Sequence, residues 1–263
     1  MLNKKILDLQ NIEFSKSYEP SSNLIYSGSG EAFMKSLCIE ALKHEAVNHT
    51  YLKKFFGAEI KDKKKALRDY AYQYSHYSRG FPIYLKNVVD RLTEKKHKDI
   101  LIENYYEELG KPNSDKFEDW PHQKMFNSFA EEVGVTEEYK AKTEICMTAK
   151  VWRQLFDEKC KSTIPGVGMG AMGVATEFIV PHIYSYLIPS IKAEKTLSSR
   201  CSYFFELHTE CDVEHGNEII ECAVELAKDS EVREGIRFGT LSSLNLRKTF
   251  WDVMNSRLEN KIG

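Results

Sequence analysis

The segment LHTECDVEHG, residues 207–216, concentrates side chains that can bind a metal ion. It contains His208, Asp212 and His215 in the pattern H-x-x-x-D-x-x-H. Each residue of an α-helix advances by about 100°, so residues four and seven positions apart return to within about 40° of one direction. Burying two imidazoles and a carboxylate on one helix face is costly unless a cation compensates. The row therefore predicts a metal site between packed helices.

Glu177 is a second candidate ligand, because it lies within the otherwise apolar segment MGVATEFIVPHI. A buried glutamate needs a cation or a strong partner. The alternative is that Glu177 faces solvent or pairs with a basic side chain. A centre that holds two metal ions and activates oxygen needs about six such ligands, rich in carboxylates and drawn from several helices.

The segment 102–126, IENYYEELGKPNSDKFEDWPHQKMF, offers the remaining ligands. Surface clusters of acids are common, so the carboxylates alone are a weak signal. A helix that ends near GKPN and is followed by a short excursion can place a glutamate beside His122. Glu108 is the preferred glutamate, and Glu107 remains its competitor.

Cys211 lies between two residues of the histidine row, so its thiol could also face the site, although a buried core thiol is the commoner role. The six cysteines form no C-x-x-C pair. The first residues, MLNKKILDLQ, do not resemble a signal peptide, and no apolar run is long enough to cross a bilayer. We therefore expect reduced, mostly buried thiols in a cytoplasmic protein.

The charge of the chain is nearly balanced, with 37 basic and 39 acidic residues and a formal net charge of −2. This balance predicts no affinity for nucleic acid or for an anionic membrane. The lysine-rich stretches 61–68 and 94–99 also contain acidic residues, so we interpret them as solvated helix faces.

Apolar residues recur with helical spacing throughout, and no segment alternates as a strand would. We expect an irregular segment at 1–28 and one all-α domain at 29–263, built as a bundle of seven or eight helices. The expected helices cover about 30–56, 61–92 with a bend near Gly80 and Pro82, 94–109, 120–133, 136–161, 166–195, 199–228 and 230–260.

Gly168, Gly170 and Gly173 form the pattern G-x-G-x-x-G, which also occurs in dinucleotide-binding sites. That fingerprint requires a preceding strand, whereas the preceding residues WRQLFDEKCKSTIP resemble a helix and its end. We instead expect these small residues to let another helix or a substrate approach the backbone before Glu177.

Together these residues resemble the haem-oxygenase-like diiron oxidases and oxygenases. The resemblance covers roughly residues 40–220, and HTECDVEH is its most specific part; DYAYQYSHYSRGFPIYL and ENYYEELGKPN with HQKMFNSFAEEVGV support it. It implies a haem-oxygenase-like bundle that binds two Fe2+ ions. The implied ligands are Glu108, His122, Glu177, His208, Asp212 and His215, while iron against manganese and the ligands of each ion stay open.

The resemblance also implies an enzyme that uses O2 to desaturate, fragment, cyclise or N-oxygenate a small substrate. An amino-acid-like substrate is the first expectation, and Arg79, Lys150 and Arg153 are candidates to bind its carboxylate. Tyr70, Tyr77 and Gly173 are candidates to line the substrate pocket. An electron donor is a further candidate partner, and a homodimer is a family expectation.

Several alternatives remain. A p-aminobenzoate synthase of the type found in Chlamydia consumes tyrosine and lysine side chains of its own; here only Tyr70 matches, and Leu52 and Leu187 occupy the other positions, which disfavours that reaction. Metal-free relatives of the thiaminase-II or pyrroloquinoline-quinone synthase type would not need three ligands on one helix. A protein-interaction module would tolerate alanine at residues 208, 212 and 215.

Overall fold

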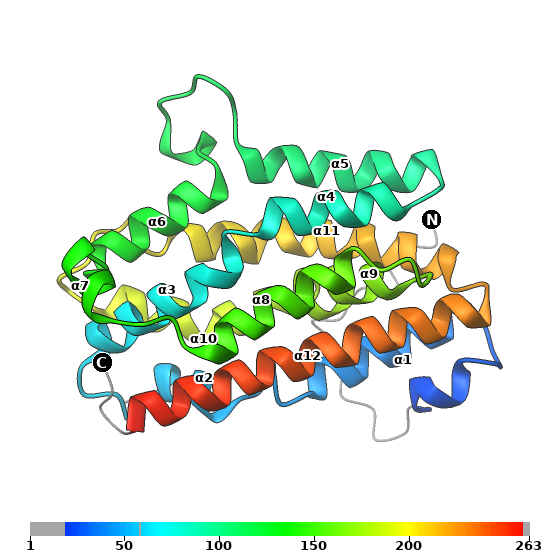
Figure 1. The fold of residues 1–263 in the computed structure, drawn as a ribbon, viewed down its shortest axis with the longest axis horizontal. Coiled ribbons are helices and arrows are strands. Elements are labelled where there is room, and N and C mark those ends of the chain that lie inside the picture. The colour runs from blue at the N-terminus through cyan, green and yellow to red at the C-terminus, as the bar shows by residue number, and fades with distance from the viewer. Residues whose placement is uncertain (1–18, 58, 260–263) are drawn as a thin grey trace.

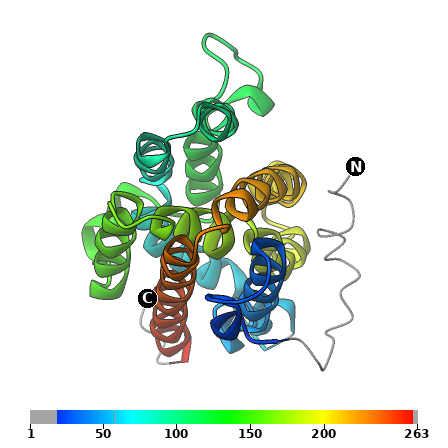
Figure 2. The same ribbon diagram turned by 90° about the vertical axis from the view of Figure 1, so that its right-hand side faces the viewer.

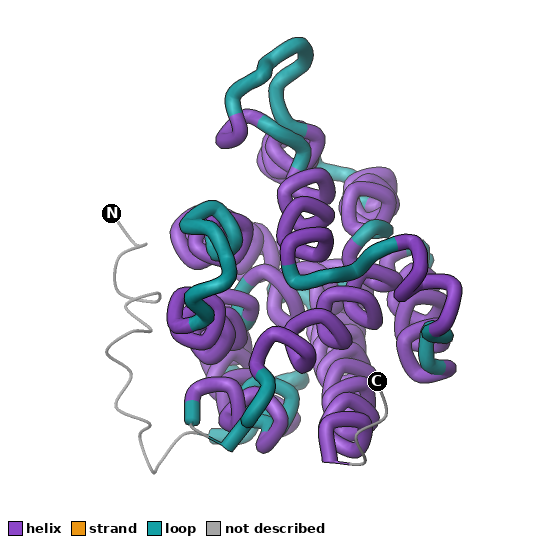
Figure 3. Tube along the Cα trace, turned by 90° about the vertical axis from the view of Figure 1, so that its left-hand side faces the viewer, coloured by secondary structure: helices purple, strands orange, loops and turns teal. Residues whose placement is uncertain are grey.

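The computed structural model describes residues 19–57 and 59–259, and of residues 210–214 only the backbone. This part of the chain folds into helices and loops and contains no strand (Figure 3). The predicted all-α fold is therefore confirmed. The helices are α1 (Gly30–Lys43), α2 (Thr50–Phe56), α3 (Lys63–Ser78), α4 (Phe81–Arg91), α5 (Lys95–Leu109), α6 (His122–Glu132), α7 (Glu137–Lys142), α8 (Met147–Cys160), α9 (Val167–Met169), α10 (Val180–Ala193), α11 (Tyr203–Leu226) and α12 (Ser230–Glu259). Shorter or wider turns form η2 (Ser21–Leu24), η3 (Phe117–Asp119) and the π-helix η4 (Gly170–Glu177).

Several predicted long helices are divided, so the described chain has more helices than the seven or eight expected. The expected helix at 30–56 ends at Lys43, and α2 starts again because Nδ1 of His49 accepts a hydrogen bond from the backbone N–H of Tyr51 at 3.1 Å. The bend expected near Gly80 is a break, and Pro82 stands in the first turn of α4. Local caps thus shorten helices that apolar spacing alone would join.

The π-helix η4 lies in the middle of the molecule, against α11 on one side and α12 on the other. A Cβ added to Gly170 would lie 2.0 Å from the carbonyl oxygen of Ile236 on α12, and one added to Gly173 would lie 2.4 Å from Cγ2 of Ile219 on α11. The expectation that these glycines allow close approach of other helices is confirmed. Every residue of η4 is buried, so it forms a fixed backbone segment that leads to Glu177.

The aromatic core is organised around one face of α3. Tyr70, Tyr74 and Tyr77 are spaced by four and three residues, so they lie on the same side of the helix. The ring of Tyr77 stacks on Trp152 of α8 with 3.9 Å between ring centres, and Tyr74 packs on Phe126 of α6 at 5.7 Å. These contacts join α3, α6 and α8 on the side of the bundle that carries the candidate site.

Different helices form the opposite outer faces of the bundle. Helices α4 and α5 lie side by side on one outer face, and the segment between α5 and α6 projects from the body (Figures 1 and 2). Helix α12 runs along the opposite part of the bundle. No described helix is both long enough and apolar enough to cross a membrane. The described cysteines are free thiols, of which Cys38, Cys160, Cys201 and Cys222 are buried.

Candidate metal centre

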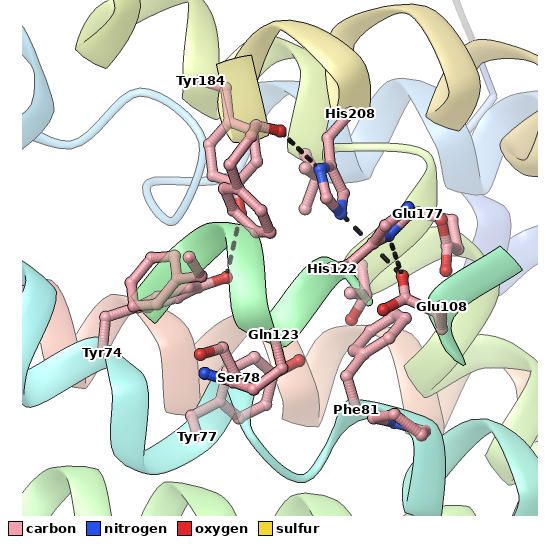
Figure 4. A pocket seen from close by; sticks show the side chains of 15 residues that line it. Tyr74, Tyr77, Ser78, Phe81, Glu108, His122, Gln123, Glu177, Tyr184 and His208 are labelled. Carbon is pink, nitrogen blue, oxygen red and sulfur yellow. Dashed lines mark hydrogen bonds and ion pairs between the residues drawn. The ribbon is translucent and has the colours of Figure 1, made fainter. Parts of the chain in front are cut away.

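Three candidate ligands from three different helices meet in the interior. Glu108 of α5, His122 of α6 and His208 of α11 are all buried, and one ligand atom from each lies within 4.8 Å of the others. Oε1 of Glu108 is 2.9 Å from Nδ1 of His122 and 3.8 Å from Nε2 of His208 (Figure 4). The structure thus brings together residues that are far apart in the sequence, and it prefers Glu108 over Glu107 as the member of this cluster.

The connection between α5 and α6 positions Glu108 beside His122. Helix α5 ends at Gly110, which has φ +67° and whose added Cβ would lie 2.5 Å from the backbone nitrogen of Pro121. The backbone N–H of Lys111 donates to the carbonyl of Asp119 at 2.8 Å, which closes the loop. His122 then follows Pro121 as the first residue of α6. As predicted, α5 ends and a short loop follows; the loop brings the start of α6 back beside the end of α5.

A backbone hydrogen bond orients the ring of His208. Its Nδ1 lies 2.6 Å from the carbonyl oxygen of Phe204, and since a carbonyl can only accept, Nδ1 carries the proton. In the neutral ring the lone pair is then on Nε2, which faces Glu108. This is the arrangement that metal-binding histidines adopt when a partner fixes the tautomer.

The charged forms of Glu108 and of the neighbouring histidines stabilise one another. Burial alone would raise the pKa of the Glu108 carboxyl, but the charge and hydrogen bonds of His122 and His208 hold this pKa well below its usual range. Burial lowers the pKa of His208. Burial would also lower the pKa of His122, but Glu108 raises it above its ordinary value. An ionised carboxylate beside a neutral imidazole is a donor pair ready for a cation.

Glu177 reaches the same interior pocket from the end of η4. Its side chain is only 2% exposed, and Nδ2 of Asn104 donates to its Oε1 at 3.4 Å. The wide π-type turn ends directly beyond Glu177, where the N–H of Phe178 donates to the carbonyl of Gly173 at 2.9 Å. Such turns often re-aim a side chain at a functional site. The structure therefore rejects the solvent-exposed alternative for Glu177, and it places this carboxylate beside the cluster without including it in the close group.

His215 pairs with the neighbouring glutamate of α5. Its Nε2 lies 2.9 Å from Oε2 of Glu107, whose side chain is half-exposed, whereas the His215 ring is buried. His208 and His215 thus both face α5, as their spacing predicts, but contact consecutive glutamates. The backbone of Asp212 lies in α11 between them, and its side chain is outside the described residues, as is that of Cys211.

A small, partly open pocket of about 40 Å³ adjoins the cluster. Its walls are mainly aromatic, and they include Tyr74, Tyr77, Phe81, Phe126, Tyr184 and Phe204. Tyr77 lies on this wall as predicted. The predicted pocket residues Tyr70 and Gly173 do not: Tyr70 stacks behind Tyr74 at 5.2 Å, and Gly173 is covered by Ile219 of α11. Arg79, Lys150 and Arg153 do not line this pocket either, and the latter two line a separate pocket at the surface.

Asn104 and Tyr184 are site residues that the sequence reasoning missed. Asn104 lies one helical turn before Glu108 on α5, so a search for polar residues on that face could have found it. Tyr184 of α10 lies beside the cluster, with its ring centre 6.0 Å from that of His208. No local pattern marks Tyr184, because its role depends on how α10 packs against α11.

The donor set fits a divalent iron ion. Imidazole nitrogens with carboxylate oxygens are typical ligands of non-haem iron, and the described site has no thiolate among its donors. Glu177 lines the same pocket as Glu108, His122 and His208, whereas His215 of α11 and Glu107 of α5 form a separate pair that does not line it.

Comparison with known proteins identifies the family of this chain. The sequence model of the iron-containing redox enzymes, a family of haem-oxygenase-like proteins, matches residues 68–248, and the chain belongs to this family. It is 28% identical to the 4-aminobenzoate synthase of Chlamydia pneumoniae over 83% of this chain and 93% of that protein. It is 26% identical to the 4-aminobenzoate synthase of Chlamydia trachomatis over 71% of this chain and 77% of that protein.

Solved structures support the fold alone. A TenA homologue from Pseudomonas syringae pv. tomato superposes with a TM-score of 0.69 at 15% identity, covering 86% of this chain and 93% of that one. A domain of unknown function with a haem-oxygenase-like fold from Shewanella denitrificans has a TM-score of 0.65 at 16% identity, covering 92% and 95%. The predicted haem-oxygenase-like architecture is therefore confirmed.

Proposed function

We propose that this chain is an O2-dependent oxidase or oxygenase that binds two iron ions and acts on a small molecule. The observation that carries the proposal is the meeting of Glu108, His122 and His208, from three helices, in a buried group next to a small pocket. Glu177 is a second buried carboxylate at the same pocket, and two buried carboxylates together with two imidazoles favour a site with more than one cation.

In the proposed reaction, the protein holds the metal-binding side chains in place and limits access of water. His208 is fixed by the carbonyl of Phe204, and Glu108 is fixed between two imidazoles, so the donors need little rearrangement to bind. The aromatic walls limit the contact of the pocket with bulk water. When bound, a pair of ferrous ions supplies electrons for the reduction of dioxygen.

The pocket constrains the substrate. A buried water needs about 10–15 Å³ of such space, so a cavity of about 40 Å³ holds about three waters and an amino acid would have to displace side chains. No lysine or arginine is among its lining residues. The hydroxyls of Tyr77 and Ser78 are buried and make no hydrogen bond of normal geometry within the described chain, so we propose that they bind a polar group of the substrate.

Iron loading tests the proposal. Metal-free protein is given two equivalents of Fe(II) without oxygen, and bound iron is measured after gel filtration; it is then mixed with oxygen in a stopped-flow spectrometer. We expect about two irons per chain, oxygen consumption and a transient visible absorption band. Uptake of fewer than one iron per chain, under conditions where the protein is folded, would contradict the proposal.

A second candidate is 4-aminobenzoate synthesis, because both curated relatives carry that name. Tyr70 is the one position that matches the side chains consumed in that reaction; it is buried and its hydroxyl makes no hydrogen bond within the described chain. Leu52 and Leu187, which are fully buried, occupy the other positions and argue against it.

The two candidates differ in what happens to the protein itself. The iron-loaded chain is incubated with oxygen and a reductant, 4-aminobenzoate is sought by mass spectrometry, and the intact protein is weighed. The synthase predicts 4-aminobenzoate together with a modified Tyr70, and the Tyr70→Phe variant would lose both signals. An unchanged intact mass with no 4-aminobenzoate would leave the small-molecule oxidase.

A further inference from the structure

A second pocket lies at the surface, between α4 and α8. It has a volume of about 300 Å³, and its lining includes Tyr84, Lys150, Arg153, Asp157 and Lys161. Helices α4 and α8 pack directly against each other, and none of the candidate metal ligands lines this pocket. The surface around it has features that the proposed reaction does not explain.

The first feature is an excess of positive charge. Asp157 is already paired with Lys161 at 2.5 Å and accepts from Asn87 at 3.0 Å. Lys150 and Arg153 form no ion pair with any carboxylate in the described part of the chain, and neither does Arg79 at the adjacent end of α3.

The surroundings of His76 indicate that these cations lie close together. Arg79 donates a hydrogen bond to its Nδ1 at 2.8 Å. Burial and the nearby charges of Arg79, Arg153 and Lys150 lower the pKa of His76 to about 4. His76 is therefore neutral at pH 7, and the surface charge comes from the three permanent cations.

The second feature is a set of exposed apolar side chains on the same two helices. Ile83 of α4 is 56% exposed, and Met147 and Val151 of α8 are 69% and 40% exposed. Val151 and Gln154 lie four and seven positions after Met147, and Lys150 lies three after it, so the four residues share one face of α8. Apolar side chains among unpaired cations are typical of a site where an acidic protein docks.

The third feature is an aromatic path from this surface to the metal centre. Tyr84 lines the surface pocket, and its ring centre is 5.6 Å from that of Tyr77. Tyr77 and Tyr74 are 5.7 Å apart, and both line the interior pocket (Figure 4). The hydroxyl of Tyr74 lies 3.3 Å from that of Tyr184, whose ring is 6.0 Å from the ring of His208. Electrons tunnel more readily through contiguous packed groups than across gaps, so this path connects surface and centre.

We propose that the α4–α8 surface is the docking site of an acidic one-electron carrier protein of the ferredoxin class. The proposal rests on the proposed iron-dependent function. Each encounter transfers one electron from the reduced cluster of the carrier to one ferric ion of the centre. No bond forms or breaks, and two encounters return a diferric pair to the diferrous state.

A carrier protein fits this surface better than a small anion. The unpaired cations come from two elements, Arg79 at the end of α3 and Lys150 and Arg153 on α8, and exposed apolar residues lie on the same surface. Transient redox complexes use small contact areas, typically below about 1,200 Å², and long-range charge attraction to speed encounter. A phosphate-like ligand would gain nothing from Ile83 or Met147.

Stopped-flow reduction tests the site. Iron-loaded, air-oxidised protein is mixed without oxygen with a reduced plant-type two-iron ferredoxin, and the absorbance change of the ferredoxin gives the second-order rate constant. The Lys150→Glu/Arg153→Glu variant should react about tenfold or more slowly at low salt, and the rate of the unaltered protein should fall as salt rises. The matched control, Lys35→Glu/Lys195→Glu, has the same change in net charge on other exposed surfaces and should react at close to the normal rate.

Two further arms separate the explanations. Reduced methyl viologen, which needs no docking site, should reduce the iron of every variant equally. At saturating ferredoxin, Tyr84→Leu should slow reduction, whereas Tyr84→Phe, which keeps the ring, should not. Sodium phosphate and sodium chloride at equal ionic strength should inhibit equally.

The docking site is overturned if charge reversal at Lys150 and Arg153 slows ferredoxin no more than the control does. It is also overturned if phosphate inhibits far more than chloride, which would indicate a small-anion site. If methyl viologen finds no reducible iron in any variant, the proposed function fails and the docking site with it. Thermal unfolding of each variant checks that the fold is kept.

Discussion

The two halves of the candidate metal centre differ in how far they are assembled. In the first half, Glu108, His122 and His208 are buried and their ligand atoms lie within 4.8 Å of one another. In the second half, Glu177 accepts from Asn104 at 3.4 Å, and His215 is paired with the half-exposed Glu107 at 2.9 Å. In the first half a cation has only to replace the Glu108–His122 contact within a group that is already close together, whereas in the second half Glu177 and His215 are held by separate partners.

The cause lies in the elements that carry each half. The first half stands at the ends of α5 and α6 and on a regular turn of α11, where the closed loop at Gly110 and the carbonyl of Phe204 fix the side chains. The second half depends on the last residue of a π-helix. We therefore expect the two halves to bind iron with unequal affinity, and the following variants test that difference.

The largest effect is expected at His208, one of the three clustered candidate ligands of the first half. His208→Ala removes the ring that faces Glu108, and we expect the tighter iron and all oxygen consumption to be lost with little change in helix content. Bound iron measured by mass spectrometry and circular dichroism checks this. His44→Ala, which alters a histidine bonded to Asn245 far along the chain, is the control and should retain two irons. A His208→Ala protein that binds iron normally would remove this residue from the centre.

Glu177→Gln should act on the second half alone. The amide can keep a hydrogen bond with Asn104 but lacks the charge, so the weaker iron should bind more than about a hundredfold less tightly while the tighter iron stays. Anaerobic iron titration should fall from two equivalents to one. If both irons are lost together, the halves form a single cooperative site and the comparison is wrong.

How much of this site the sequence predicts depends on whether the information is local. The spacing of His208 and His215 predicts their common face, because a helix fixes directions over two turns. The apolar surroundings of Glu177 mark it as a candidate for burial but leave solvent exposure as an alternative, which the structure then rejects. The position of Tyr184 and the covering of Gly173 by Ile219 do not follow, since both depend on how helices distant in the sequence pack.

The same distinction applies to the fold. Helical periodicity is sufficient for an all-α bundle, and the ends of α5, α6 and α12 lie within two residues of those predicted. The division at His44–His49 depends on a histidine cap that competes with a continuing helix, and composition does not reveal it.

A smaller effect is expected at Asn104, which touches Glu177 but would not bind iron itself. Asn104→Ala removes the amide that donates to Glu177, so the weaker iron should bind about tenfold less tightly and oxygen consumption should slow without being abolished. Asn104→Asp would add a carboxylate and Asn104→Gln restores an amide, so partial rescue by glutamine alone would identify a positioning role. Equal loss in all three variants would indicate that residue 104 is needed only for packing.

The smallest effect, of opposite sign, is expected at Glu107. If Glu107 only occupies His215 until a cation arrives, Glu107→Gln removes a competitor, and the weaker iron should bind slightly more tightly, by less than about tenfold. Glu108→Gln, one residue further along α5, should instead lose the tighter iron, because this carboxylate contacts both His122 and His208. Parallel iron titrations of the two variants compare neighbouring glutamates on one helix turn. A Glu107→Gln protein that loses an iron would make Glu107 a ligand. The observed contact between Glu107 and His215 would then be part of the second iron site, not a pairing that iron must displace.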